Sequence, residues 1–119
     1  MRLDHVQLAI PAGAEDACRA FYCGVLGWTE LQKPEALRAR GGLWLQAGDS
    51  QVHLGVEADF RAARRAHPAF AVDDLDALAE RLRVAGAPVE FDEAIPGLRR
   101  FYTSDAVGNR IEFLEALQR

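Results

Sequence analysis

The chain has three histidines, and each lies in a segment whose alternation of residue types is typical of a β-strand. His5, His53 and His67 lie opposite the large apolar residues of their segments, and Glu112 has the same position in a fourth segment. Small or polar residues share their face, which leaves room above the sheet. Imidazole and carboxylate groups bind Zn, Ni, Fe and Mn. We therefore expect a divalent metal ion to be bound by at least three of these four residues.

A single histidine on a strand is most often a structural or surface residue, so the prediction depends on the joint pattern. An internal repeat provides that pattern, because His5-x-x-Leu8-Ala9-Ile10 recurs as His67-x-x-Phe70-Ala71-Val72. The last strand of the first copy carries His53, and the last strand of the second copy carries Glu112. The four candidate ligands are thus symmetric under the repeat. A bound ion could polarise a carbonyl group, with Glu112 moving a proton as the catalytic residue.

Each copy of the repeat contains a strand, a helix and further strands. In the first copy the pattern predicts a strand over 3–10, a helix from Ala14 to Val25, and strands near 40–47 and 51–57. In the second copy it predicts a strand over 67–72, a helix from Leu75 to Ala85, and strands over 88–91, 99–104 and 110–114. We expect an α+β fold of two βαβββ modules, about 1–58 and 66–116. They would form one domain, 1–119, with a curved mixed sheet around a cavity.

Composition excludes several classes of protein. The 119 residues are 50% hydrophobic and 27% charged, with a net charge of −4, so the basic surface of a nucleic-acid-binding protein is absent. The sequence has no apolar run long enough to span a membrane and no apolar leader segment after Met1. The two cysteines, Cys18 and Cys23, would point about 140° apart on a helix, which disfavours a mutual disulfide. We expect a cytoplasmic protein.

Several further residues could line a substrate cavity. Gln7 shares the face of His5, and Trp44 could form a wall. In the strand 99–104, alternation directs either Arg99, Phe101 and Thr103 or Arg100, Tyr102 and Ser104 inward. Arg100 and Tyr102 are our candidates for substrate binding. The arginines at 61, 64 and 65 form either a solvated linker or a rim that binds a carboxylate or phosphate.

The chain resembles the vicinal oxygen chelate superfamily, which includes glyoxalase I, extradiol dioxygenases, fosfomycin-resistance thiol transferases and bleomycin-resistance proteins. The resemblance lies in four segments that cover most of the chain, LDHVQLAI at 3–10, AFYCGVLG at 20–27, HPAFAVDDLDAL at 67–78 and DAVGNRIEF at 105–113. It implies paired βαβββ modules, a homodimer, and metal positions at His5, His53, His67 and Glu112. Glyoxalase-like members most often have Glu where this chain has His53. Dioxygenase-like and fosfomycin-type members use two His and one Glu, which His5, His67 and Glu112 supply.

The resemblance implies a metal-dependent enzyme that acts on a small, metal-chelating oxygenated substrate. Chemistry of the glyoxalase type, an isomerase or lyase, is our first expectation, with the ion stabilising an enediolate while Glu112 moves the proton. A dioxygenase or thiol transferase on the same ligands is an alternative. A non-enzymatic protein that sequesters a small molecule or antibiotic, as in bleomycin resistance, is another. The sequence leaves open which metal is bound and whether each site forms within one chain or across a dimer.

Overall fold

The computed structural model describes residues 1–115. Module one begins with strand β1 (His5–Ile10), followed by helix α1 (Glu15–Arg19), which continues without a break into the π-helix η1 (Ala20–Val25). Strand β2 (Thr29–Leu31), the short helix α2 (Glu35–Arg38), and strands β3 (Leu43–Ala47) and β4 (Ser50–Val56) complete it. The glycine at 27, with φ of +76°, follows the helical segment and allows the chain to turn into β2.

Module two repeats this order with strand β5 (Ala69–Val72), helix α3 (Leu75–Val84) and strands β6 (Glu90–Phe91), β7 (Arg100–Ser104) and β8 (Arg110–Glu115). Asp74 caps the start of helix α3, and its side chain accepts a hydrogen bond of 3.0 Å from the Ala77 amide. Its buried stripe consists of Leu75, Leu78, Ala79 and Leu82. The helix therefore packs its apolar face inward and leaves its charged face in solvent.

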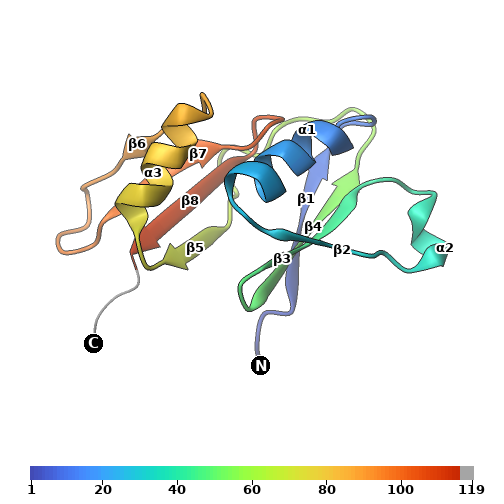
Figure 1. Ribbon diagram of the computed structural model, residues 1–119, viewed down its shortest axis with the longest axis horizontal. Coiled ribbons are helices and arrows are strands. Elements are labelled where there is room, and N and C mark those ends of the chain that lie inside the picture. Colours follow the sequence, from blue (N-terminus) through green and yellow to red (C-terminus); the bar gives the residue numbers. More distant parts are fainter. Residues whose placement is uncertain (116–119) are drawn as a thin grey trace.

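The strands form two four-stranded sheets, with the orders β1-β4-β3-β2 and β5-β8-β7-β6. In each sheet the first and last strands of the module pair in parallel, and the other pairs are antiparallel. The two sheets lie beside one another, and helices α1 and α3 cover the same side of the molecule (Figure 1). This arrangement confirms the predicted α+β fold with two βαβββ modules.

The structure differs from the sequence-based prediction in several local features. The pattern analysis missed β2 and α2, which are only 3 and 4 residues long. The predicted helix over 14–25 is present, but its second half has π-helical hydrogen bonding. His67 lies two residues before β5 rather than within a strand. Residue 116, the predicted end of module two, lies outside the described residues.

The two modules are joined by a continuous core and by a buried polar network. Trp28 of module one packs edge-on against Phe70 of module two, with ring centroids 5.0 Å apart. Asn109, in the β7–β8 turn, donates to the Ala9 carbonyl at 2.8 Å and accepts from the Ala63 amide at 2.9 Å. These contacts connect β1, the linker and the last turn, so hydrogen bonds as well as apolar packing link the two modules.

Two other sequence-based expectations can be compared with the structure. Cys18 is buried, Cys23 is half-buried, and both are free thiols, as the helical spacing predicted. Among residues 1–115, no helix is both long and apolar enough to cross a membrane.

Candidate functional site

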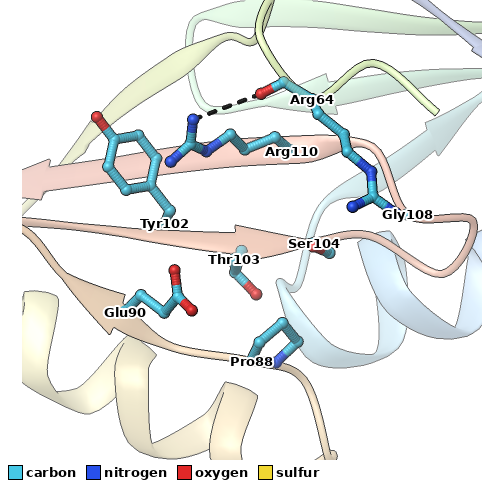
Figure 2. A pocket seen from close by; sticks show the side chains of 8 residues that line it. All are labelled: Arg64, Pro88, Glu90, Tyr102, Thr103, Ser104, Gly108 and Arg110. Carbon is cyan, nitrogen blue, oxygen red and sulfur yellow. Dashed lines mark hydrogen bonds between the residues drawn. The ribbon is translucent and has the colours of Figure 1, made fainter.

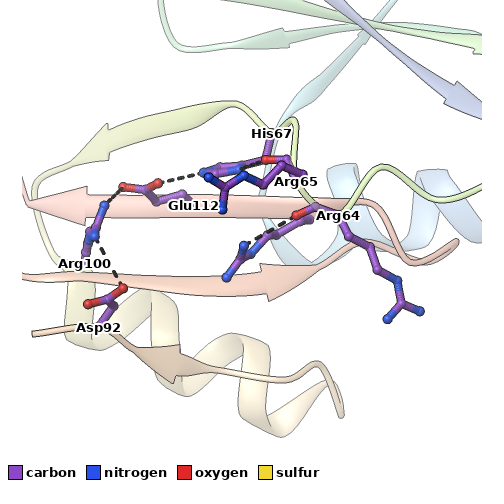
Figure 3. Close-up of polar contacts among 7 residues, drawn as sticks. Arg64, Arg65, His67, Asp92, Arg100 and Glu112 are labelled. Carbon is purple, nitrogen blue, oxygen red and sulfur yellow. Dashed lines mark hydrogen bonds and ion pairs between the residues drawn. The ribbon is translucent and has the colours of Figure 1, made fainter. Parts of the chain in front are cut away.

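The second module brings His67 and Glu112 into direct contact (Figure 3). His67 Nε2 lies 2.9 Å from Glu112 Oε1, and Arg100 Nη1 donates to the other carboxylate oxygen, Oε2, at 3.4 Å. Arg100 also donates to Asp92 at 3.3 Å, so its guanidinium connects the two carboxylates. Glu112 is 6% exposed, which makes it a buried carboxylate held by one imidazole and one guanidinium.

The hydrogen bonds of His67 determine which of its ring atoms can bind a cation. Its Nδ1 donates to the Arg65 carbonyl at 2.8 Å, and a carbonyl can only accept, so Nδ1 carries a proton. Nε2 then faces the Glu112 carboxylate, which also only accepts when ionised. The two atoms are therefore complementary when they share a second proton or when both bind the same metal ion. Metal-binding histidines commonly donate their other ring N–H to a carbonyl in this way.

The first module stacks three aromatic rings on one face of its sheet. The His53 ring lies between those of His5 and Trp44, with centroid distances of 4.1 and 4.2 Å and nearly parallel planes. His53 Nε2 donates to Gln51 Oε1 at 3.0 Å. The register of β4 explains the arrangement, because His53 pairs with Trp44 on β3, while His5 lies on the neighbouring β1. His53 is thus enclosed by rings and by an amide.

His5 is more exposed than His53 and is oriented by its sequence neighbour. His5 Nδ1 donates to Asp4 Oδ2 at 2.9 Å, which leaves Nε2 as the atom that could bind a metal. This hydrogen bond lowers the pKa of Asp4. Burial lowers the pKa of His53, and the nearby His5 ring lowers it further. The stack lines a pocket of about 470 Å³ that also contains Lys33 and Arg40.

The four candidate substrate-binding residues divide between the same two sheets. Gln7 and Trp44 line the pocket of module one, and Gln7 lies over Gly55, where a Cβ atom would come within 2.6 Å of its Nε2. Gln7 therefore fills part of the space that the small residues leave. Arg100 and Tyr102 lie on the Glu112 face of module two, since Tyr102 pairs with Glu112. Phe101 and Thr103 are buried on the opposite face. The sequence left open which of the two sets of residues in the strand 99–104 faces Glu112, and the structure shows that it is the set with Arg100 and Tyr102.

The four predicted ligands form two pairs rather than one cluster. His5 and His53 lie together on the first sheet, and His67 and Glu112 lie together at the second. Within residues 1–115, no group of three His, Cys, Asp or Glu side chains is close enough to share a metal ion. The described chain therefore holds the candidate ligands as two separate pairs, which we call half-sites.

A further pocket of about 310 Å³ lies beside Tyr102 and contains Arg64, Glu90 and Arg110 (Figure 2). The Arg110 guanidinium lies 3.7 Å from the centre of the Tyr102 ring. The edge of the His67 ring approaches Tyr102, with centroids 5.4 Å apart, so this pocket adjoins the His67–Glu112 pair. Sequence reasoning missed Glu90 and Arg110. Alternation alone could have indicated Arg110, which lies two residues before Glu112 on the same strand face.

The donor atoms of the two half-sites fit a divalent transition metal. The ligand set would be mixed, with two imidazole Nε2 atoms and one carboxylate. In each of the two imidazole rings, Nδ1 is hydrogen-bonded to an oxygen. His53 fits this set less well because its Nε2 is already bonded to Gln51. The ligands that fit best are therefore His5, His67 and Glu112.

The chain belongs to the glyoxalase-like family. The model of the Glyoxalase-like domain matches residues 7–114, which includes both half-sites except His5. The fold and sequence thus place the chain in the vicinal oxygen chelate superfamily, as the motifs predicted. No curated protein matches the chain.

Solved structures show the same fold along almost the whole chain. A protein from Bacillus anthracis assigned to the glyoxalase family is 47% identical, with a TM-score of 0.94 over 98% of this chain and 96% of that one. Lactoylglutathione lyase from Agrobacterium tumefaciens is 24% identical, with a TM-score of 0.69 over 93% and 92%. A fosfomycin resistance protein from Listeria monocytogenes is 15% identical, with a TM-score of 0.79 over 98% and 94%. The last two similarities concern the fold alone.

Proposed function

We propose that this protein is a metal-dependent enzyme that acts on a small oxygenated substrate, with His5, His67 and Glu112 as the metal ligands. The observation that carries the proposal is the contact between His67 Nε2 and Glu112 Oε1. His67 donates through Nδ1 to the Arg65 carbonyl, and its Nε2 faces the Glu112 carboxylate oxygen at 2.9 Å, the distance of an N–H···O hydrogen bond. A metal ion bound by both atoms would replace the proton that they share. The orientation of His5 by Asp4 supplies a third ligand with the same chemistry.

We also propose that a second copy of the chain completes each site, so that the protein functions as a cytoplasmic homodimer. His5 is 43% exposed at its side chain and lies on the first sheet, whereas His67 and Glu112 belong to the second module. A two-fold symmetric pair could bring the first sheet of one subunit to the second module of the other, and two equivalent sites would result. The free thiols of Cys18 and Cys23 are consistent with a reducing compartment.

The residues of module two are arranged for proton transfer. A bound divalent ion would polarise the substrate oxygens. Glu112 is fixed from both sides by His67 and Arg100, so its carboxylate is the group positioned to accept and return a proton. An isomerase or lyase reaction of the glyoxalase type needs this transfer. Dioxygenase and thiol-transferase reactions on the same ligands remain alternatives that the identity of the metal would distinguish.

A specific observation also favours a second, non-enzymatic candidate. The stacked rings of His5, His53 and Trp44 line a pocket of about 470 Å³. Flat ring faces suit an aromatic ligand. A protein that sequesters a small aromatic molecule or antibiotic would use this pocket without a metal.

Metal content of untagged protein, measured by mass spectrometry before and after incubation with Zn, Ni, Mn and Fe(II), tests the proposal. We expect about one divalent ion per chain, lost in His67→Ala and in His5→Ala. His53→Phe is the matched control, because it preserves a stacked ring and should retain the ion. If the wild-type protein binds none of the four metals, the proposed metal-dependent enzyme is contradicted and the sequestering protein is favoured. An aromatic ligand whose affinity is unchanged in His67→Ala would support that second candidate.

A further inference from the structure

The pocket beside Tyr102 forms where strand β6 ends. β6 pairs with β7 only at Glu90 and Phe91, so within the described chain β7 has no partner strand on that side beyond Tyr102. The pocket occupies this open edge, and Figure 2 shows Arg64 and Arg110 on one side of the β7 ribbon and Glu90 on the other. Side chains of both charges thus line one concave surface of about 310 Å³.

The charged side chains of this pocket form no ion pair with one another or with any other described residue. Within residues 1–115, Arg64, Arg110 and Glu90 make no ion pair, whereas Arg19, Arg99 and Arg100 each bind two carboxylates. The pocket therefore has a positive wall, formed by Arg64 and Arg110, and a negative wall, formed by Glu90. Both walls are available to a ligand.

The positive wall is held in place by its own contacts. The Arg110 guanidinium lies over the Tyr102 ring at 3.7 Å, and its Nη1 donates to the Arg64 carbonyl at 3.4 Å. A stacked guanidinium loses little freedom when it binds a ligand, and its remaining N–H groups can bind a carboxylate through two hydrogen bonds. Thr103, which also lines the pocket, has a buried hydroxyl group without a partner in the described chain. The surroundings are therefore polar as well as charged.

We propose that this pocket binds a small ligand with a free α-amino acid group. The carboxylate of the ligand would bind Arg110, and its ammonium group would donate to Glu90. A ligand with only negative charge, such as inorganic phosphate, would meet the Glu90 carboxylate and bind more weakly. None of the three charged residues is a proposed metal ligand, so this inference does not rest on the proposed enzymatic function.

Binding can be measured without metal, by following the Ser104 and Gly108 amide signals in the ¹H–¹⁵N spectrum of EDTA-treated protein. We expect L-alanine to shift these signals to saturation. N-acetyl-L-alanine lacks the ammonium charge and L-alaninamide lacks the carboxylate, so each should bind roughly tenfold more weakly, as loss of one charge-assisted hydrogen bond predicts. Because the protein is metal-free throughout, failure of the metal proposal would leave this result unaffected.

Three variants assign the interaction to the named side chains. Arg110→Gln and Glu90→Gln should each weaken L-alanine binding by roughly tenfold, and Arg110→Lys, which keeps the charge but loses the paired hydrogen bonds, provides a second test if Arg110→Gln does not fold. Arg61→Gln is the matched control, since Arg61 is an exposed arginine of the same linker that does not line the pocket. The proposal is overturned by the absence of a saturable shift, by N-acetyl-L-alanine or phosphate binding as tightly as L-alanine, or by equal weakening in Arg61→Gln.

Discussion

The hydroxyl group of Tyr22 donates to Asp105 Oδ2 at 2.6 Å, in a fully buried contact that joins the π-helix of module one to the β7–β8 turn of module two. Asp105 also accepts from the amides of Val107 and Asn109, at 3.0 and 2.8 Å. Because Asn109 in turn binds Ala9, this carboxylate stands at the centre of the connection between the modules.

Replacing Tyr22 with Phe should lower the free energy of unfolding by about 1–3 kcal/mol, because a buried carboxylate oxygen loses its shortest hydrogen bond. Urea denaturation followed by circular dichroism measures the change. Tyr102→Phe is the control, since Tyr102 is half-exposed and its hydroxyl makes no hydrogen bond within the described chain. Equal destabilisation by the two substitutions would contradict the importance of the Tyr22–Asp105 bond.

The alkaline stability of the protein should depend on Cys18. Burial raises the pKa of this thiol from its usual value near 9 to about 11, and the Asp105 carboxylate adds to the shift. The unfolded chain therefore loses the proton first as pH rises. The stability that the neutral buried thiol provides is complete below pH 9.0 and is lost as pH rises to about 11.

Unfolding free energies of the wild type should thus fall by up to about 2–3 kcal/mol across this window from Cys18 alone. Cys18→Ala should flatten the dependence, although its stability at neutral pH will be lower because of the lost packing. Urea titrations at several pH values test this, with Cys23→Ala for comparison. If the unfolding free energy of Cys18→Ala falls with pH as steeply as that of the wild type, other groups dominate alkaline unfolding.

Gly42 should tolerate no side chain. Its φ is +82°, and a Cβ atom there would lie 2.0 Å from the Leu54 carbonyl oxygen. Gly42→Ala should therefore destabilise the protein by about 2–4 kcal/mol, through backbone strain and displacement of β4. Gly48 also has a positive φ, of +58°, but its Cβ atom would meet nothing within 4 Å. Gly48→Ala should cost only about 1 kcal/mol, and thermal unfolding of both variants would measure the difference.

The role of His53 can be separated from that of His5. We expect His53→Phe to keep its metal, since a phenyl ring can occupy the position between His5 and Trp44. His5→Phe removes a proposed ligand and should lose the ion. Metal content of the two purified variants is the readout. Loss of metal in His53→Phe, with the fold intact by circular dichroism, would restore the four-ligand set that the sequence analysis expected.

A mixture of two inactive variants tests whether subunits share each site. His5→Ala and Glu112→Ala should each bind no metal alone. After unfolding and refolding together, mixed dimers would contain one site with the intact His5 of one chain and the intact Glu112 of the other. We expect metal at about one quarter of the sites in an equal mixture. No recovery in a mixture that forms dimers would mean that each site lies within one chain.

Much of the fold could be predicted because the repeat and the alternation reflect strong constraints. The strands that carry His53 and Glu112 have 7 and 6 residues, and in each the predicted ligand lies between two buried apolar residues, Val52 and Leu54 or Ile111 and Phe113, so the alternation is clear. Short elements such as β2 and α2 have too few residues for a periodic signal. The π-helical bonding of η1 arises from local hydrogen-bond geometry, to which apolar spacing is insensitive.

The sequence predicted which residues belong to the candidate site, but it did not predict which of them lie together. Alternation correctly placed His5 on the face of Gln7, but it left open which face of the strand 99–104 lies beside Glu112, and the pairing of Tyr102 with Glu112 gives the answer. Alternation could not show that the two modules form separate sheets, because strand order is a long-range property. The contact of His67 with the Arg65 carbonyl also depends on a loop conformation that residue types do not specify.

The linker between the modules is hydrogen-bonded to the last turn of the protein. Ala63 donates to Asn109 Oδ1 and accepts from the Arg110 amide at 2.8 Å. A chain that contained only one of the two modules would lack these contacts. The repeat is therefore asymmetric in its polar contacts, and neither half alone contains all the partners that its buried polar groups require.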